Sequence, residues 1–123
     1  MKNRLLVLAA LGEALTGLVL FVYPPIGIKL LFGTEAIGAA VVMSRIAGIA
    51  LIALGLACWP CATMSCGVFG MLTYSALATF YLLYVAIGGE WVGPLLWPAV
   101  VLHAALTLLL AGAWFKRQEN PSN

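Results

Sequence analysis

Two residues of opposite charge lie inside long apolar segments of this chain, where an ionisable side chain is costly. Glu13 lies near the middle of segment 5–23, and Arg45 lies within segment 36–59. Each segment is long enough to cross a bilayer, which takes about 20 apolar residues. Each charge therefore needs a partner inside protein, and the simplest interpretation is a direct contact between Glu13 and Arg45 across two packed helices.

The single histidine adds a third polar group at the same depth. His103 falls near the centre of segment 95–114, and Thr107 follows one helical turn later on the same face. At a rise of about 1.5 Å per residue, His103 lies level with Glu13 and Arg45. Two tyrosines of the third segment can reach this depth with their hydroxyl groups. The predicted buried polar layer consists of Glu13, Arg45, Tyr74, Tyr81, His103 and Thr107.

This layer has two interpretations, and the sequence leaves both open. In the first, it is a proton path or a pocket for a polar headgroup such as a quinone or a small anion, with Arg45 as the charged anchor. In the second, Glu13 and Arg45 form a structural ion pair, and a neutral, hydrogen-bonded His103 helps to hold three helices in register.

Cys58 and Cys61 form a CxxC motif with Pro60 before the second cysteine, a pattern typical of thiol oxidoreductases. The pair ends an apolar segment, however, and the C-terminal pole of a helix does not stabilise a thiolate. On the predicted side of the membrane it also faces a reducing compartment. No metal site is predicted, because Cys58, Cys61 and Cys66 supply three ligands and His103 lies about half a membrane away.

The composition places these residues in a membrane. Of 123 residues, 64% are hydrophobic and 8% are charged, whereas a soluble domain carries about 25% charged residues. We therefore predict an all-α, integral membrane four-helix transmembrane bundle, antiparallel, in a single domain over residues 1–123. The predicted spans are 5–23, 36–59, 67–87 and 95–114, followed by a polar tail at 116–123.

The connection between the first two spans predicts a short interfacial helix. Pro24 and Pro25 end the first span, and the next ten residues are too few to cross a bilayer. Thr34 is the predicted N-cap of the second span. Small residues at helical spacing predict close packing of the helices. In the first two spans these are Gly12, Thr16, Ala40, Ser44, Gly48 and Gly55.

The flanking charges predict the topology. Lys2 and Arg4 precede the first span, and Lys116 and Arg117 follow the fourth. By the positive-inside bias both termini are cytoplasmic, in a multi-pass protein of the bacterial inner membrane. The net charge of +2 thus reflects topology, and without a basic patch interleaved with aromatic residues we predict no nucleic-acid partner.

One stretch resembles a known grouping. The run GEALTGLVLFVYPPIGIKLLFGTE, followed by SRIAGIALIALGLACW, is similar to the first half of small four-helix bacterial membrane proteins of the broad DoxX-like grouping, over residues 12–59. The resemblance implies a four-helix bundle, and in the named member of the grouping a membrane subunit of a quinone-linked sulfur-oxidising complex. It supplies no catalytic residue to place on this chain.

Because no complete catalytic set is present, we predict an accessory or structural subunit of a larger membrane complex rather than an enzyme. Its partners would be the lipid bilayer and other membrane subunits or a second copy of the chain. The first alternative is a small-molecule, quinone or proton-handling protein that uses Glu13, Arg45 and His103. The second alternative is a membrane thiol–quinone oxidoreductase that uses Cys58 and Cys61.

Overall fold

The computed structural model describes residues 2–59 and 64–119, which form five α-helices. They are α1 (Lys2–Val22), α2 (Pro24–Phe32), α3 (Ala39–Ala57), α4 (Met64–Gly88) and α5 (Leu96–Glu119). All except α2 are long and apolar enough to cross a membrane. The predicted all-α fold, with four spans and a short helix between the first two, is confirmed. α5 includes the first residues of the predicted polar tail, and residues 120–123 lie outside the described part.

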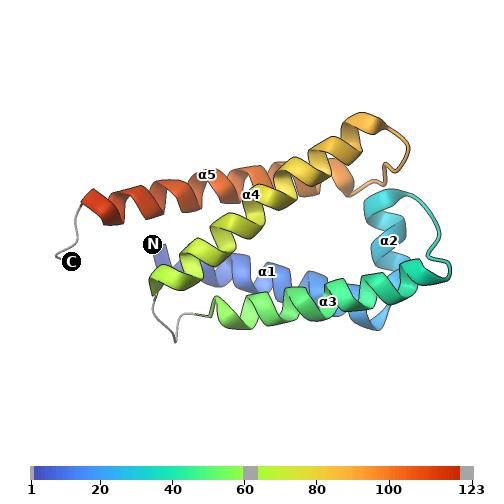
Figure 1. Cartoon of the computed structure of the whole chain (residues 1–123), viewed down its shortest axis with the longest axis horizontal. Helices are drawn as coiled ribbons and strands as arrows, with labels where there is room; N and C mark the ends of the chain where they lie inside the picture. The colour runs from blue at the N-terminus through green and yellow to red at the C-terminus, as the bar shows by residue number, and fades with distance from the viewer. Residues whose placement is uncertain (1, 60–63, 120–123) are drawn as a thin grey trace.

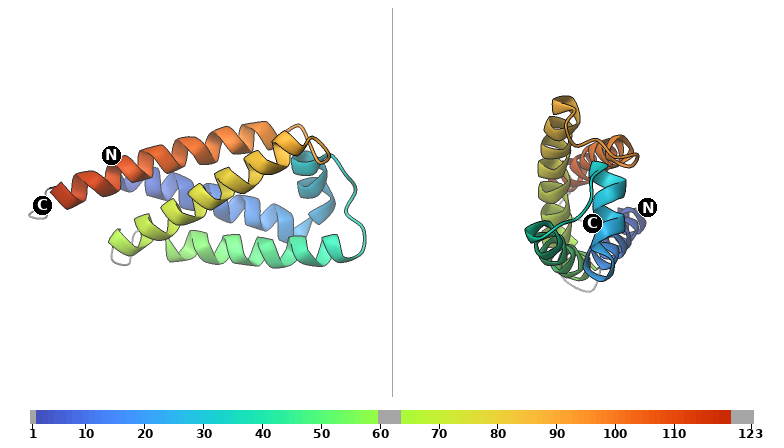
Figure 2. Two further views of the ribbon diagram at one scale, coloured as in Figure 1. Left: turned by 45° about the horizontal axis from the view of Figure 1, so that its top comes forward. Right: turned by 90° about the vertical axis from the view of Figure 1, so that its right-hand side faces the viewer.

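The four long helices are arranged as two pairs (Figure 1). α1 packs along α3, and α4 packs along α5, while contacts between the pairs are sparser. α2 lies at the end of the molecule opposite the two termini, where it contacts α1, α3 and α5. Figure 2 shows the same arrangement in an oblique view and end-on. Both termini therefore lie at one end, as an even number of spans requires.

Small residues bring α1 and α3 into backbone contact. A Cβ atom on Gly48 would lie 2.5 Å from the carbonyl oxygen of Gly17, so no larger residue fits there without a shift. Next to it, the hydroxyl group of Ser44 donates a hydrogen bond to the carbonyl oxygen of Leu20 at 3.2 Å. Such close approach provides the packing on which helix association in lipid relies. Gly12, by contrast, has open space beside it and makes no such contact.

The helix ends at α2 and α3 follow from proline and glycine. α2 begins at Pro24, which suits a first helical turn because that turn needs no backbone N–H donor from it. It ends at Gly33, whose φ of 69° is the left-handed conformation of a helix C-cap. Gly38, with φ 57°, directly precedes α3. The predicted N-cap at Thr34 is therefore wrong, because the chain turns at Gly38 and the helix starts after it.

The loop before α5 is tied to the last turn of α2. The N–H group of Gly93 donates to the carbonyl oxygen of Leu31 at 3.0 Å, and that of Leu95 donates to Leu30 at 2.8 Å. These backbone hydrogen bonds join the first helix pair, through α2, to the second pair at the end away from the termini.

Two buried apolar clusters lie along the seam between the helices. The larger draws on α1, α4, α5 and the residue after α3, and the smaller lies between α4 and α5 nearer to α2. The larger contains Leu6, Ala9, Ala10, Cys58, Val68, Met71, Leu106 and Leu110. The smaller contains Ala86, Leu96 and Val100. Tyr74 and Ser75 of α4 and His103 of α5 lie between these two clusters in the chain.

Candidate functional site

Glu13 is buried in the centre of α1, where only 5% of its surface is exposed. Its neighbour Ala14 faces α3, since a Cβ atom on Gly55 would lie 3.1 Å from the Ala14 methyl group. Successive residues of a helix point about 100° apart. Glu13 is thereby turned from the α1–α3 seam towards α4 and α5.

His103 of α5 is the partner that Glu13 meets there. Its Nδ1 atom lies 3.8 Å from Oε1 of Glu13, and both side chains are buried. This separation is too long for a direct hydrogen bond, which spans about 2.7–3.2 Å between heavy atoms. It suits two groups that exchange a proton through a bridging molecule. An imidazole binds and releases protons near neutral pH, and Glu and His side chains inside membrane spans commonly form proton relays.

Tyr74 of α4 completes the cluster. Its ring meets the ring of His103 edge-on, with centroids 5.6 Å apart and planes at 79°. We call Glu13, Tyr74 and His103 the central cluster. Three residues of the predicted polar layer are thus brought together, one from each of α1, α4 and α5.

Arg45 is not part of this cluster, and the predicted Glu13–Arg45 contact is wrong. The Arg45 side chain is exposed on α3, and no carboxylate in the described part of the chain lies within 4 Å of it. The reason is the helix seam: Ser44 and Gly48 face α1, so Arg45 points about 100° away from Ser44. Small residues thus fix the direction of Arg45.

Tyr81 and Thr107 also differ from the prediction. Tyr81 is 65% exposed, because it lies on the outer face of α4, where Leu77 and Tyr84, one turn on either side, are exposed as well. Thr107 is half-buried, and its hydroxyl group donates to the carbonyl oxygen of His103 at 2.8 Å. That hydroxyl group therefore has its hydrogen-bond partner within α5, and Thr107 is not counted as a member of the central cluster.

Ser75, which the sequence reasoning missed, is a further polar residue of the seam. It follows Tyr74 and is fully buried. Its hydroxyl group meets no hydrogen-bond partner within the described residues. The sequence held one signal for it: Met71, Ser75 and Thr79 are spaced four residues apart and so share one face of a helix. A serine on the same face as a core methionine is expected to be buried.

The cysteine motif can be judged in part, because Cys61 lies outside the described residues. Cys58 directly follows α3 and is buried in the larger apolar cluster. Its thiol donates to the carbonyl oxygen of Gly67 at 3.4 Å. Burial raises the pKa of the Cys58 thiol. Since thiol chemistry requires the thiolate, this position works against an exchange reaction at Cys58.

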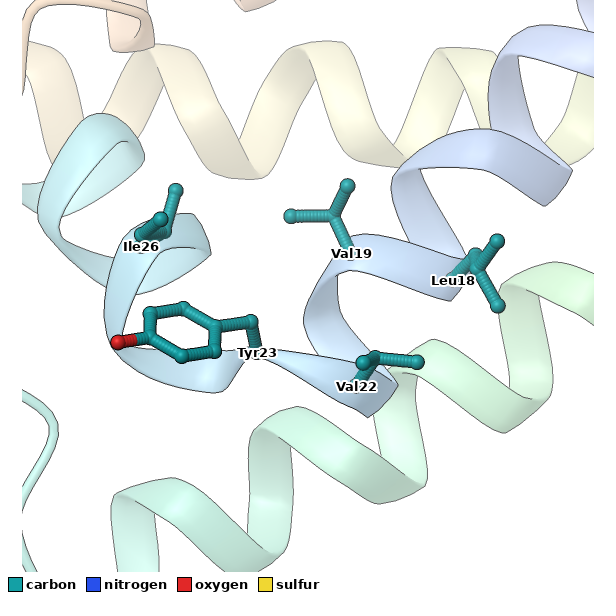
Figure 3. Close-up of a pocket in the computed structure, with 5 residues that line it drawn as sticks. All are labelled: Leu18, Val19, Val22, Tyr23 and Ile26. Carbon is teal, nitrogen blue, oxygen red and sulfur yellow. The ribbon is translucent and has the colours of Figure 1, made fainter.

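A separate hollow of about 380 Å³ lies where α1 meets α2 (Figure 3). Its lining is apolar except for the hydroxyl group of Tyr23, and all five side chains are exposed. They are Leu18, Val19, Val22, Tyr23 and Ile26. The hollow contains no member of the central cluster, so it is not the site of acid–base chemistry.

The comparisons with known proteins give no match among protein-family models, curated proteins or solved structures. The four apolar helices establish a small multi-pass membrane protein, and its chemistry must be inferred from the central cluster.

Proposed function

We propose that this small multi-pass membrane protein handles protons at Glu13 and His103. The observation that carries the proposal is the 3.8 Å approach of two buried, proton-binding side chains from α1 and α5. Ionisable residues inside spans are rare, and those that face the bundle interior commonly form proton relays. Tyr74 supports the pair from α4, so three helices hold the site.

The proton transfer changes the protonation of these two side chains alone. A proton leaves the carboxyl oxygen of Glu13 and joins the imidazole of His103, or moves back, and the total charge of the pair is unchanged by this step. That matters in a membrane, because a net charge in a low-dielectric medium is far more costly than a close pair of opposite charges.

Proton flux across liposomes tests the proposal. The purified chain is reconstituted with a pH-sensitive dye inside, a pH step is applied, and the initial rate is compared with that of empty liposomes. We expect flux from the parent chain and a large loss in Glu13→Gln and His103→Gln. Glu90→Gln, the same change at an exposed residue, is the matched control and keeps the parent rate. A parent rate equal to that of empty liposomes would refute the proposal.

A second candidate function, a subunit of a larger membrane assembly, is favoured by Arg45. This residue is about 9 Å along α3 from Ala39 and is exposed. An arginine facing lipid at the centre of a span costs at least about 2.5 kcal/mol, and such residues almost always face protein. Another subunit or a second copy would cover it.

Native mass spectrometry after extraction in mild detergent tests this second function. We expect the parent chain to carry a further subunit or copy, and Arg45→Met to lose it. A parent chain that is monomeric in several mild detergents contradicts the assembly. A bound quinone in the same spectra would instead favour a small-molecule function. The DoxX-like resemblance and the inner-membrane orientation stay proposals on which neither function depends.

A further inference from the structure

We infer that Ser75 and His103 together bind one water molecule beside Glu13, and that this water passes the proton between Glu13 and His103. The inference rests on the proton-handling function, and it adds Ser75 of α4 to the residues that carry out that function. Two buried side-chain atoms in the described part of the chain meet no hydrogen-bond partner: Oγ of Ser75 and Nδ1 of His103. Buried polar groups are rarely left so, because an unmade hydrogen bond is costly.

Helix packing puts the two atoms at one level. On α4, Ser75 lies one turn beyond Met71, and on α5, His103 lies one turn before Leu106. Met71 and Leu106 belong to the same apolar cluster. Since α4 and α5 run antiparallel, Ser75 and His103 lie on the same side of that cluster, each about one turn from it. Tyr74, next to Ser75 in the chain, already touches the His103 ring.

The hydrogen-bonding capacities match those of water. A buried water typically makes about three hydrogen bonds. Here Nδ1 of His103, Oε1 of Glu13 and the Ser75 hydroxyl group offer three. At 3.8 Å the first two atoms are too far apart for a direct hydrogen bond, and a water that lies to one side of the line between them can bond to both. Proton transfer is then balanced: the water gives one proton to Nδ1 of His103 as it takes one from the carboxyl group of Glu13, or the reverse, while the Ser75 hydroxyl group orients it.

Two readouts test the inference, and the first does not depend on flux. Infrared difference spectra between low and high pH are recorded in ordinary and in heavy-oxygen water. We expect a water stretching band that shifts with the isotope in the parent chain and is lost in Ser75→Ala. Ser44→Ala, an equally conservative change at a buried serine of the other helix pair, keeps the band. A parent chain without the band, or a Ser75→Ala variant that keeps it, overturns the inference.

The second readout is proton flux in liposomes. We expect Ser75→Ala to lose flux several-fold and Ser44→Ala to keep the parent rate. A Ser75→Ala variant at the parent rate, while Glu13→Gln is inactive, overturns the inference and leaves the proton-handling function intact. If the parent conducts no protons, that function fails and the infrared band alone decides the water site. Ser75→Thr retains the hydroxyl group and must show the band if Ser75→Ala does not fold.

Discussion

Gly48 of α3 lies against Gly17 of α1 with only backbone between them, since a Cβ atom on Gly48 would be 2.5 Å from the Gly17 carbonyl oxygen. We expect Gly48→Ala to force the two helices apart and to destabilise the protein by roughly 1–3 kcal/mol, the usual cost of overpacking. Thermal melting in detergent measures this.

Gly12→Ala is the matched control for that substitution. Nothing lies within 4 Å of a Cβ atom at Gly12, so the added methyl group meets no neighbour. Alanine is the better helix former by about 1 kcal/mol in water, and we expect this variant to melt at or above the parent temperature. Equal losses in both variants would mean that the seam does not depend on close backbone contact.

A double-mutant cycle separates the observed pair from the predicted one. We expect Glu13→Gln and His103→Gln to be coupled by about 0.5–3 kcal/mol in unfolding free energy, because the side chains share one site. Glu13→Gln and Arg45→Met should instead be additive within about 0.5 kcal/mol. Strong coupling to Arg45 and none to His103 would contradict the arrangement of the central cluster.

The two described cysteines should differ in reactivity. Cys58 is buried and Cys66 is exposed. Because burial raises the pKa of the Cys58 thiol, less thiolate is present at neutral pH, and alkylation speeds up only as the pH rises. We expect maleimide at neutral pH to label position 66 well before position 58, as read by peptide mass spectrometry. Rapid labelling of Cys58 would revive the thiol–quinone alternative.

Topology is tested by reporter fusion. Lys2, Arg4 and Lys116 flank the outermost spans, and both termini lie at the same end of the molecule. We therefore expect a periplasm-active reporter at the C-terminus to be inactive and a cytoplasm-active one to be active. The reverse pattern would invert the orientation without changing the fold.

The helices were predictable because length and apolarity determine a span. The predicted segments differ from the helices by one to five residues at their ends. One of these differences follows from a glycine: Gly38 delays α3 to Ala39, three residues after the predicted start. The pairing of α1 with α3 was only partly predictable. Ser44 and Gly48 were identified as packing residues, but Gly17, which has the closest contact, was not.

The central cluster was predictable in depth but not in direction. Counting residues placed Glu13, Arg45 and His103 at one level, because rise per residue is constant. Which way a side chain points depends on the face that packs, and a shift of one residue turns it by about 100°. Opposite charge therefore favoured Arg45 as the partner of Glu13, whereas the small residues of the α1–α3 seam direct Glu13 to His103.

The pairing of Glu13 with His103 also sets an order of events during synthesis. The first span carries the carboxyl group and the last span carries its partner, 90 residues later in the chain. At about 5–20 residues per second, the ribosome needs roughly 5–20 s to deliver the histidine. Throughout that interval the first span holds an unpaired acid in the membrane. A chain truncated before α5 would keep it so, and would be a natural target for membrane proteases or for a chaperone that shields polar spans.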